Sequence, residues 1–498
     1  MDDAQVEDFG DTRVSLRSIA IVLGIYLVLA AVLPAADDEV YYWTWSKELQ
    51  WSYYDHPPMT AVLIYLSTAV FGDSVFGFRV PPCVASAVVV YVIGRLTRCR
   101  LLMLGVLFSP LFTIGAVMMT PDSPLILFWA LYLWWLVELQ QRLAPEAGAE
   151  GSVPKPVKIT WGWWTLGGII LGCGVLSKYT MGLIVPATFV SLLLSRRRLT
   201  DWISGYVYHG VVSAVVASPI LIYNIQQGFE PLLFQWKHAA QTTPNALRSM
   251  VEFIGVQILL FGTLPFYLFP WVIKRFLTLC QNPRLRACSC LYALPLAFFV
   301  YKSTQTRLEG NWALVCFISF WPLAAVWYDS VRASKFWHWS TASAFLPPAI
   351  AVVVIFIHLV SPLSIVPVKL DRIHRQFAVD DATAEVARII QERGEKIPVF
   401  ADSYQMTSWL RFHGLPAQQV DGATRPSHFT RPPRRLTNVD RAYVVTNLPL
   451  SPILTEGFGL PEVVASVPMQ VRGVTEGTLN IRLYQKPNRN PVGELEVP

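Results

Sequence analysis

Long apolar runs alternate with short polar segments over roughly the first three quarters of the chain. Crossing a bilayer takes about 20 residues of helix, and most of these runs approach or exceed that length. The pattern therefore predicts a polytopic α-helical membrane protein with about eleven spans. The predicted spans are 14–36, 80–95, 101–119, 123–139, 161–177, 179–194, 204–222, 250–273, 287–301, 311–328 and 338–361.

The pattern changes after residue 361. Pro, charged residues and short alternating segments replace the long apolar runs. The segment 382–393 predicts an amphipathic helix with Asp381 as its N-cap. The segments 398–401, 441–446 and 480–484 predict strands. We therefore predict a transmembrane domain at 1–361 and a soluble α/β domain at 362–498.

Composition supports a membrane protein. The 498 residues are 53% hydrophobic and 15% charged, against about 25% charged residues in soluble domains. The chain has 18 Trp, 19 Tyr and 27 Phe, which is typical of aromatic belts at membrane interfaces. The net charge of +6 indicates no nucleic-acid binding, because the basic residues fall in short clusters between apolar runs. Cys288 and Cys290 lack a second ligand pair, so the cysteines predict no zinc site.

The basic residues also predict an orientation. One set of loops, which includes the cluster Arg196, Arg197 and Arg198, carries more than twice as many Lys and Arg as the opposite set. The positive-inside rule places the richer set in the cytoplasm. The first loop, 37–79, and the C-terminal domain then face the other side. For a bacterial inner-membrane protein, that side is the periplasm.

The first outer loop holds the most informative residues. Asp37, Asp38 and Glu39 directly follow the first span, and Asp55 and His56 follow soon after. Carboxylates cannot lie in hydrocarbon without a large free-energy cost, so they must stand at the membrane surface. Within this loop, 40–49 and 59–71 predict two short helices.

Later outer turns add further charged groups, among them Asp122, Lys178 and His238. Lys178 interrupts a nearly continuous apolar stretch from Gly167 to Leu194. A lone Lys there can simply extend its ammonium group to the interface. The alternative is an anionic partner near the bilayer surface, such as a lipid phosphate.

Acids, bases and aromatic residues on one membrane face suit glycosyl transfer from a lipid-phosphate sugar. A carboxylate can act as general base on an acceptor hydroxyl or amine. Lys and Arg can neutralise the phosphate that leaves. Direct displacement predicts inversion at the sugar carbon, and a double displacement through a nucleophilic carboxylate stays open.

Several segments resemble a known group of enzymes. DDEVYYWTWSKELQWSYYDHPPM resembles the first periplasmic loop of bacterial GT-C glycosyltransferases. These include the lipid A aminoarabinose transferases, the protein O-mannosyltransferases and the rhizobial lipopolysaccharide galacturonosyl transferases, the last being the most similar. MMTPDSPLILFWAL, LSKYT, FQWKHAA, LEGNWA, ADSYQMTSWLRFHG and DGATRPSHF resemble later motifs of that group. The resemblance implies a GT-C fold and a polyprenyl-phosphate sugar donor.

The resemblance also assigns roles to residues. Asp38 matches the catalytic acid or base, Glu39 its motif partner, and Asp37 is an extra neighbour. Asp122 matches a second catalytic acid. The donor phosphate is assigned to Lys178, Arg79 and Arg307, and substrate binding to Tyr54, Asp55, His56 and Lys302.

Metal dependence is a separate question. In the aminoarabinose transferases, a Glu-Lys pair stands at the positions of Asp55 and His56, and its carboxylate is associated with a metal. His56 departs from that pattern. Asp55 and His238 are the candidate ligands of a divalent ion, although one Asp and one His do not complete a zinc shell.

Two other functions compete with an enzyme. A transporter or flippase of polyprenyl-linked glycans would place charges near the bilayer midplane and show internal repeats. A non-catalytic subunit of an envelope-assembly complex would not need Asp38, Asp122 and Lys178. Charges gathered on one face favour the transferase. Its acceptor stays open between lipid A or lipopolysaccharide core, another glycan and a protein.

Aromatic residues of the first loop have two interpretations. Trp43, Trp45, Trp51, Tyr53 and Tyr54 predict an interfacial belt, with sugar stacking as the alternative for one or two of them.

Overall fold

The structure is a computed structural model, and it describes residues 15–97, 100–144, 159–240, 242, 245–331, 335–430, 436–448, 458 and 460–486. The chain divides into two compact units. The first unit comprises Met1–Val32 and Leu49–Phe356, and the second comprises Leu33–Glu48 and Ile357–Pro498. The short segment that carries Asp37, Asp38 and Glu39 thus belongs to the same unit as the C-terminal part of the chain.

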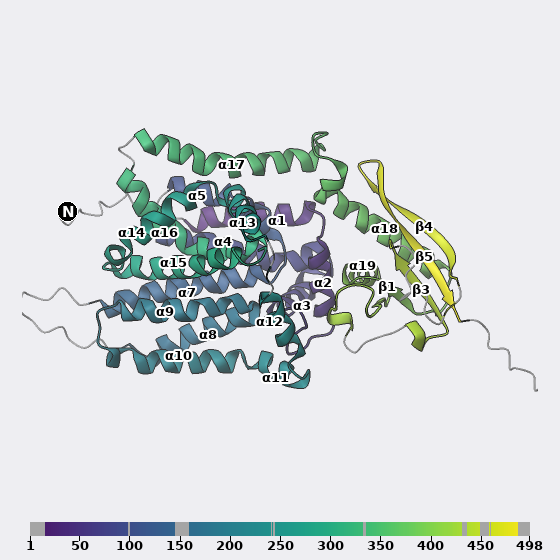
Figure 1. The fold of residues 1–498 in the computed structure, drawn as a ribbon, viewed down its shortest axis with the longest axis horizontal. Coiled ribbons are helices and arrows are strands. Elements are labelled where there is room, and N and C mark those ends of the chain that lie inside the picture. Colours follow the sequence, from purple (N-terminus) through teal and green to yellow (C-terminus); the bar gives the residue numbers. More distant parts are fainter. Residues whose placement is uncertain are drawn as a thin grey trace, which may run out of the picture. The chain divides into compact units, whose positions relative to one another are not determined.

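The first unit is built from helices (Figure 1). They are α1 (Leu16–Val32), α3 (Met59–Phe71), α4 (Val75–Thr97), α5 (Arg100–Leu107), α6 (Pro110–Thr113), α7 (Asp122–Leu143), α8 (Trp161–Ser177), α9 (Ile184–Leu193), α10 (Ile203–Val216), α11 (Ser218–Gln226), α12 (Glu230–Ala240), α13 (Ala246–Phe261), α14 (Leu264–Leu279), α15 (Pro283–Ser303), α16 (Leu314–Val331) and most of α17 (Lys335–Val360). Short 3-10 turns precede α7, α9 and α16. Five helical spans among the described residues are long and apolar enough to cross a membrane, or up to eight if each bent pair counts as one span. The chain is therefore a polytopic helical membrane protein.

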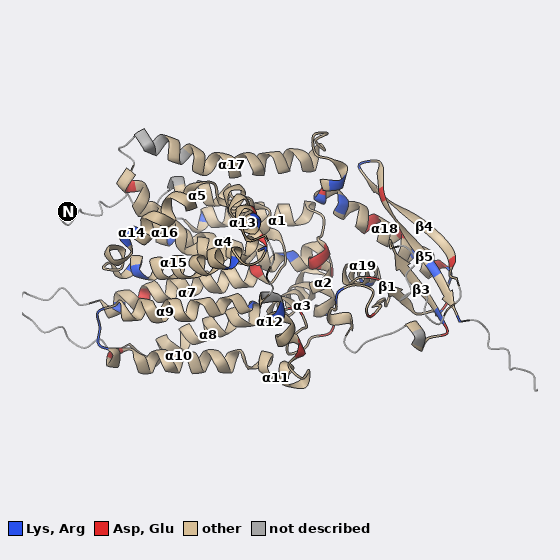
Figure 2. Ribbon diagram, viewed as in Figure 1, with Lys and Arg blue, Asp and Glu red and all other residues tan. Residues whose placement is uncertain are grey.

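Helix α7 runs through the core of this unit. It packs against α4, α8 and α15, and α8 also packs on α10 (Figure 1). Trp129, Leu133 and Leu136 of α7 are fully buried. The helices of this unit carry few charged residues along their length (Figure 2). Because α7 is held on several sides, its first residue is placed firmly relative to the neighbouring helices.

Three predicted spans are broken in the structure. The segment 204–222 contains α10 and α11, which meet at an angle of 48°. The segment 101–119 contains α5, α6 and a short 3-10 turn instead of one helix, and Pro110 begins α6. The segment 250–273 contains α13 and α14, which meet at an angle of 106°. Gly262 forms this corner with φ of 72°, and a Cβ there would lie 1.6 Å from the Ala344 carbonyl oxygen. Only glycine fits such a turn.

The second unit contains a five-stranded sheet with the order β2-β1-β3-β5-β4 (Figure 1). Strand β1 pairs in parallel with β2 and β3, and β5 pairs antiparallel with β3 and β4. The elements are α2 (Asp37–Ser46), α18 (Arg372–Glu392), α19 (Tyr404–Phe412), β1 (Val399–Ala401), β2 (Gln418–Gln419), β3 (Arg441–Thr446), β4 (Glu462–Val471) and β5 (Val474–Gln485).

The predicted elements of this unit are partly right. The helix at 59–71 in the first unit and the strand at 441–446 here are confirmed. The helix predicted at 382–393 begins ten residues earlier, at Arg372. Its N-cap is Asp371, whose carboxylate accepts the His374 backbone N–H at 3.0 Å, so the assignment of Asp381 as cap was wrong. An Asp can cap only where the backbone leaves helical geometry, and Asp381 lies inside the helix.

A two-residue turn joins β4 to β5. Arg472 and Gly473 both have positive φ, 52° and 77°. This geometry matches the twist of the flanking strands in a tight hairpin. The Arg472 side chain donates to the carbonyl oxygens of Leu363 and Val366, so the hairpin turn contacts the segment between α17 and α18.

Candidate functional site

Three polar side chains meet at the ends of helices in the first unit. Asp122 is the first residue of α7, Lys178 follows the last residue of α8, and Asn311 lies in the 3-10 turn before α16. The Lys178 ammonium group donates to Asp122 Oδ1 at 2.7 Å, and Asn311 Nδ2 donates to Asp122 Oδ2 at 2.7 Å. We call these residues the Asp122 cluster.

Local structure explains this meeting. Helix α8 ends at Ser177, and Lys178 adopts an extended backbone with φ of −159° before the next 3-10 turn begins. Asp122 in the first turn of α7 also suits the positive end of the helix dipole. The Lys178 and Asp122 side chains are 13% and 12% exposed. The pair is therefore largely removed from water while still open to a ligand.

The first unit also contains an apolar groove of about 690 Å³. Leu176 lines it, together with Met59 and Val62 of α3 and Pro219 of α11. Its polar lining is confined to a few groups, such as Tyr223 and Gln226. The groove is large and apolar enough to hold part of an apolar chain.

The predicted substrate residues of the first loop lie against α12. The ring centroids of Tyr54 and Phe234 are 4.8 Å apart, and Gln235 Nε2 donates to the Asp55 carbonyl oxygen at 2.6 Å. Tyr54 and Asp55 are buried, and the His56 carbonyl oxygen accepts the Tyr53 backbone N–H. The YDHPPM and FQWKHAA segments, which are far apart in the sequence, thus pack against each other.

The other predicted phosphate and substrate residues have different surroundings. Arg79 is buried in α4, and its guanidinium donates to the Ala30 carbonyl oxygen at 3.3 Å. Arg307 is 72% exposed and pairs with Glu252 of α13 at 3.7 Å. Lys302 donates to Gln305 at 3.3 Å. None of these contacts involves the Asp122 cluster, so the substrate roles of the three residues stay predictions.

In the second unit, the three acids at the start of α2 are in three different environments. Glu39 is fully buried, and its carboxylate accepts the Ala36 backbone N–H at 3.0 Å, which caps α2. Asp37 is partly buried and accepts the Trp409 indole N–H at 2.8 Å. Asp38 is exposed, and the Tyr404 hydroxyl donates to its Oδ1 at 3.0 Å. Asp38 is the member of the triplet whose side chain is most open to a substrate.

Metal binding was predicted at Asp55 and His238. The Asp55 side chain is buried beside α12, the helix that carries His238, but the His238 side chain lies outside the described residues. The described residues therefore place one of the two candidate ligands, and the metal site stays a prediction. We derive no catalytic step through a metal.

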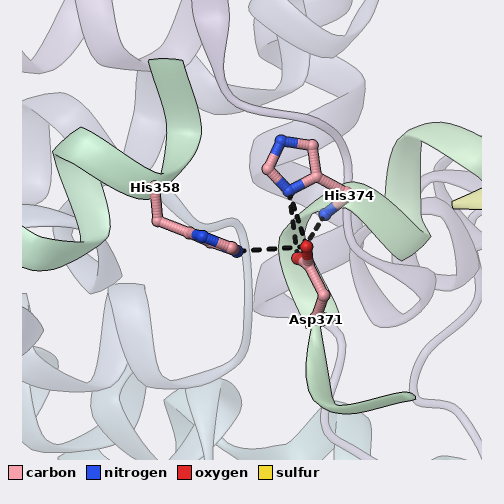
Figure 3. Close-up of side chains that lie close together, drawn as sticks. All are labelled: His358, Asp371 and His374. Atoms are coloured by element: carbon pink, nitrogen blue, oxygen red, sulfur yellow. Dashed lines mark hydrogen bonds and ion pairs between the residues drawn. The ribbon is translucent and has the colours of Figure 1, made fainter. Parts of the chain in front are cut away.

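Three metal-ligating side chains lie close together elsewhere, in the second unit (Figure 3). His358 Nε2 lies 3.1 Å from Asp371 Oδ2, and His374 Nδ1 lies 2.9 Å from the same oxygen. His358 Nδ1 accepts the Leu363 backbone N–H at 2.9 Å, which leaves the proton of the neutral ring on Nε2, facing Asp371. The Arg472 guanidinium also lies 3.3 Å from Asp371.

This His358–Asp371–His374 group does not fit a metal. A metal-ligating nitrogen must be unprotonated, and a cation would meet the guanidinium of Arg472. Burial alone would raise the pKa of Asp371, but hydrogen bonds from the His374 backbone, His358 and His374 outweigh it and lower the pKa to about 2. The group is a carboxylate enclosed by donors that connects α17, α18 and the β4–β5 turn.

The aromatic residues of the first loop are mostly inside the protein. Trp43, Trp45, Tyr53 and Tyr54 are buried, whereas Trp51 is 55% exposed. A belt at the membrane interface requires rings that contact lipid head groups, so that prediction is wrong for the four buried residues. Trp45, for example, packs edge-on against Tyr41 with ring centroids 4.9 Å apart.

In each unit, the fold brings a residue that the predicted site omitted into contact with a predicted site residue. Asn311 lies in LEGNWA, and Tyr404 lies in ADSYQMTSWLRFHG. Both segments are among the motifs that resemble known enzymes, which was the available signal. Sequence spacing could not show that their side chains contact Asp122 and Asp38, because the contacts join residues 189 and 366 positions apart.

Comparison with known proteins agrees with this fold. Residues 55–223 match the family model of dolichyl-phosphate-mannose-protein mannosyltransferases. ArnT from Cupriavidus metallidurans matches with a TM-score of 0.61 when bound to undecaprenyl phosphate and 0.63 in the apo state, at 15% and 14% identity. Each match covers 93% of this chain, and 97% or 96% of ArnT. At this level of identity the match shows a shared fold, so the chain has the fold of ArnT.

Two other proteins extend the comparison. The lipid A galacturonosyltransferase RgtD of Rhizobium johnstonii is 24% identical over 343 residues, which cover 64% of this chain and 67% of RgtD. The oligosaccharyltransferase AglB from Archaeoglobus fulgidus, in complex with an inhibitory peptide and a dolichol-phosphate, matches with a TM-score of 0.53 at 11% identity. That match covers 86% of this chain and 69% of AglB.

Proposed function

We propose that this protein transfers a sugar from a polyprenyl-phosphate donor to an acceptor of the bacterial cell envelope, with inversion at the sugar carbon. The single observation that carries the proposal is the Asp122 cluster, where a largely buried lysine ammonium group is held by a carboxylate at 2.7 Å. The similarity to RgtD, a lipid A galacturonosyltransferase, favours lipid A or lipopolysaccharide core over another glycan or a protein as acceptor.

The cluster suits a phosphate leaving group. Breaking the bond between the sugar carbon and the phosphate oxygen leaves additional negative charge on the polyprenyl phosphate. Lys178 can take this charge, because its ammonium group is held in place by Asp122 at 2.7 Å. In a site with little water, such a preorganised charge stabilises the transition state more than it would in bulk water. The groove beside Leu176 offers room for the start of the polyprenyl chain.

Asp122 itself acts mainly through Lys178. Both of its carboxylate oxygens already accept a hydrogen bond, one from Lys178 and one from Asn311. These two bonds hold the carboxylate against Lys178 and Asn311. We therefore assign Asp122 to positioning of the lysine, and we assign the general base to Asp38, which is exposed.

A single base predicts a one-step displacement. Asp38 accepts the proton of the acceptor hydroxyl or amine while the acceptor attacks the sugar carbon and the polyprenyl phosphate departs. The sugar then changes its anomeric configuration. The basic loops of the chain support an orientation in the inner membrane with α2 and the C-terminal unit in the periplasm.

The test uses the full-length protein in detergent with a panel of polyprenyl-phosphate sugars and a lipid A or core acceptor. We expect one donor to be consumed, with release of polyprenyl phosphate and transfer of the sugar. Lys178→Ala should lower the rate at least about 100-fold. Lys274→Ala is the matched control, because Lys274 is an exposed residue of α14. Product stereochemistry, measured by NMR, should show inversion.

Three results would overturn parts of the proposal. Full activity of Lys178→Ala would remove the phosphate role of the cluster. Retention of configuration would exclude a one-step displacement with Asp38 as the base, and would indicate a double displacement instead. Absence of turnover with every donor, together with movement of a labelled polyprenyl-linked glycan across vesicles, would favour a flippase.

A further inference from the structure

Helix α19 contacts the start of α2 at two neighbouring carboxylates. Tyr404 is the first residue of α19, and its hydroxyl donates to Asp38 Oδ1 at 3.0 Å. Trp409, further along the same helix, donates its indole N–H to Asp37 Oδ1 at 2.8 Å. Both contacts lie within the second unit, so one helix of the C-terminal α/β fold fixes the acids that follow the first span.

The position of Tyr404 is itself well determined. The Ser403 side chain caps α19 by accepting the Met406 backbone N–H, so the helix begins at a fixed residue. The Tyr404 ring lies against Tyr41 of α2, with ring centroids 4.6 Å apart. The guanidinium carbon of Arg425 lies 4.2 Å from the centroid of the Tyr404 ring. Tyr404 is only 9% exposed. Its hydroxyl therefore has little freedom to leave Asp38.

The charges around Tyr404 keep its hydroxyl a donor. Burial and then the negative charge of Asp38 raise the pKa of Tyr404, so the phenol stays protonated at neutral pH. Asp37 and Glu39 on α2 add negative charge nearby, and Arg425 adds positive charge. A permanent donor at Oδ1 orients the Asp38 carboxylate.

From this geometry we propose that Tyr404 is a positioning residue for the general base Asp38, and that the C-terminal unit thereby takes part in catalysis. The inference rests on the proposed function, because it assumes that Asp38 is the base. Tyr404 acts through Asp38 and need not touch the acceptor. Trp409 supports the same arrangement by fixing Asp37, the preceding residue.

The test compares Tyr404→Phe with Asp38→Asn in the full-length protein, with Tyr443→Phe as control. Tyr443 is a buried tyrosine of the same unit whose hydroxyl contacts Arg393 and Glu395 instead of α2. We expect Tyr404→Phe to lower kcat about 10-fold, with KM for the donor nearly unchanged. The acidic limb of the pH–rate profile should move to higher pH, because the ionised carboxylate loses a hydrogen bond.

A second readout does not depend on the substrate. Carbodiimide labelling of the exposed Asp38 carboxyl group, followed by peptide mass spectrometry across a pH series, reports its protonation. Tyr404→Phe should move the midpoint upward by about half to one pH unit, whereas Tyr443→Phe should leave it in place. Thermal unfolding of each variant shows whether the fold is retained.

The outcomes separate the two proposals. An unchanged rate, pH profile and labelling midpoint in Tyr404→Phe, while Asp38→Asn is inactive, would overturn the role of Tyr404 and leave the proposed function standing. Full activity of Asp38→Asn would remove Asp38 as the base, and with it the proposed catalytic role of Tyr404. If no donor turns over, the labelling midpoint decides whether Tyr404 controls the Asp38 carboxyl group.

Discussion

Two buried carboxylates, Asp122 in the first unit and Asp371 in the second, use the same chemistry in different surroundings. Asp122 accepts from one ammonium group and one amide, and its side chain is 12% exposed. Asp371 lies between the imidazoles of His358 and His374 (Figure 3). The Arg472 guanidinium is also near it, and the Asp371 side chain is fully buried. Both negative charges are compensated. The difference lies in how many donors hold each carboxylate and whether a ligand can reach it.

This difference suits the Asp122 cluster to ligand binding and the Asp371 group to stabilising the fold. A partly exposed pair of one cation and one anion can rearrange when a phosphate arrives, because Lys178 can bind both anions. Removing one partner of Asp371 would instead leave a fully buried charge with fewer donors, which is unfavourable. Asp371 also caps α18, so its bonds fix the backbone as well as the side chains.

The largest expected effect is that of Asp122→Asn. The amide keeps the shape but loses the charge that orients Lys178, so we expect kcat/KM to fall about 100-fold, or about 2.7 kcal/mol in transition-state stabilisation. Steady-state assays with the preferred donor measure it. Asp440→Asn is the control, because the Asp440 side chain is 92% exposed and pairs with Lys486 in the second unit. A rate within threefold of wild type would remove Asp122 from the mechanism.

Asp371→Asn should change stability instead of chemistry. Because the folded-state pKa of Asp371 is lowered to about 2, its ionised form contributes stability that is present above about pH 4 and lost as the pH falls toward 2. The shift corresponds to roughly 2 kcal/mol. Hydrogen exchange of peptides from 372–392 measures this locally. The wild-type protein should lose protection between pH 4 and 2, and the variant should lack that pH dependence.

An equal pH dependence in Asp371→Asn and wild type would contradict this account. In that case other carboxylates would control acid unfolding of the second unit.

Asn311→Ala should have the smallest of the three effects. It removes one hydrogen bond from Asp122 but keeps the Lys178 pair, so we expect about a 10-fold loss of kcat/KM, or about 1.4 kcal/mol. Asn311→Asp is the informative second variant, because it keeps the size and places a negative charge against Asp122. If Asn311→Asp is more active than Asn311→Ala, Asn311 serves packing and not the carboxylate.

Much of the fold could be predicted from local pattern. The helix at 59–71 and the strand at 441–446 are where apolar periodicity placed them. The single span predicted at 250–273 was wrong because hydropathy alone does not show where an apolar run bends. One glycine with positive φ, pressed against Ala344, divides that run into two helices. The cap of α18 was predicted wrongly because the segment recognised as amphipathic, 382–393, covers only the second half of the helix, which begins at Arg372.

The site was predictable only as a set of residue types. Asp38, Asp122 and Lys178 stood out as charges beside apolar spans, and the motifs gave them expected roles. Their partners did not stand out. Asn311 and Tyr404 are ordinary polar residues in sequence, and they become informative only when the fold brings them within 3.0 Å of the acids.

The sequence by itself determined the membrane class, the alternation of spans and loops, and the charged residues that hydrocarbon cannot hold, because burial of charge in lipid is costly at any position along a helix. Tertiary structure alone decided how the carboxylates divide their work. Glu39 is buried and caps α2 by accepting the Ala36 backbone N–H. The Trp409 indole N–H fixes Asp37, and the Tyr404 hydroxyl orients the exposed Asp38. Three adjacent acids have similar chemistry in the unfolded chain, and only their different neighbours in the folded protein separate their roles.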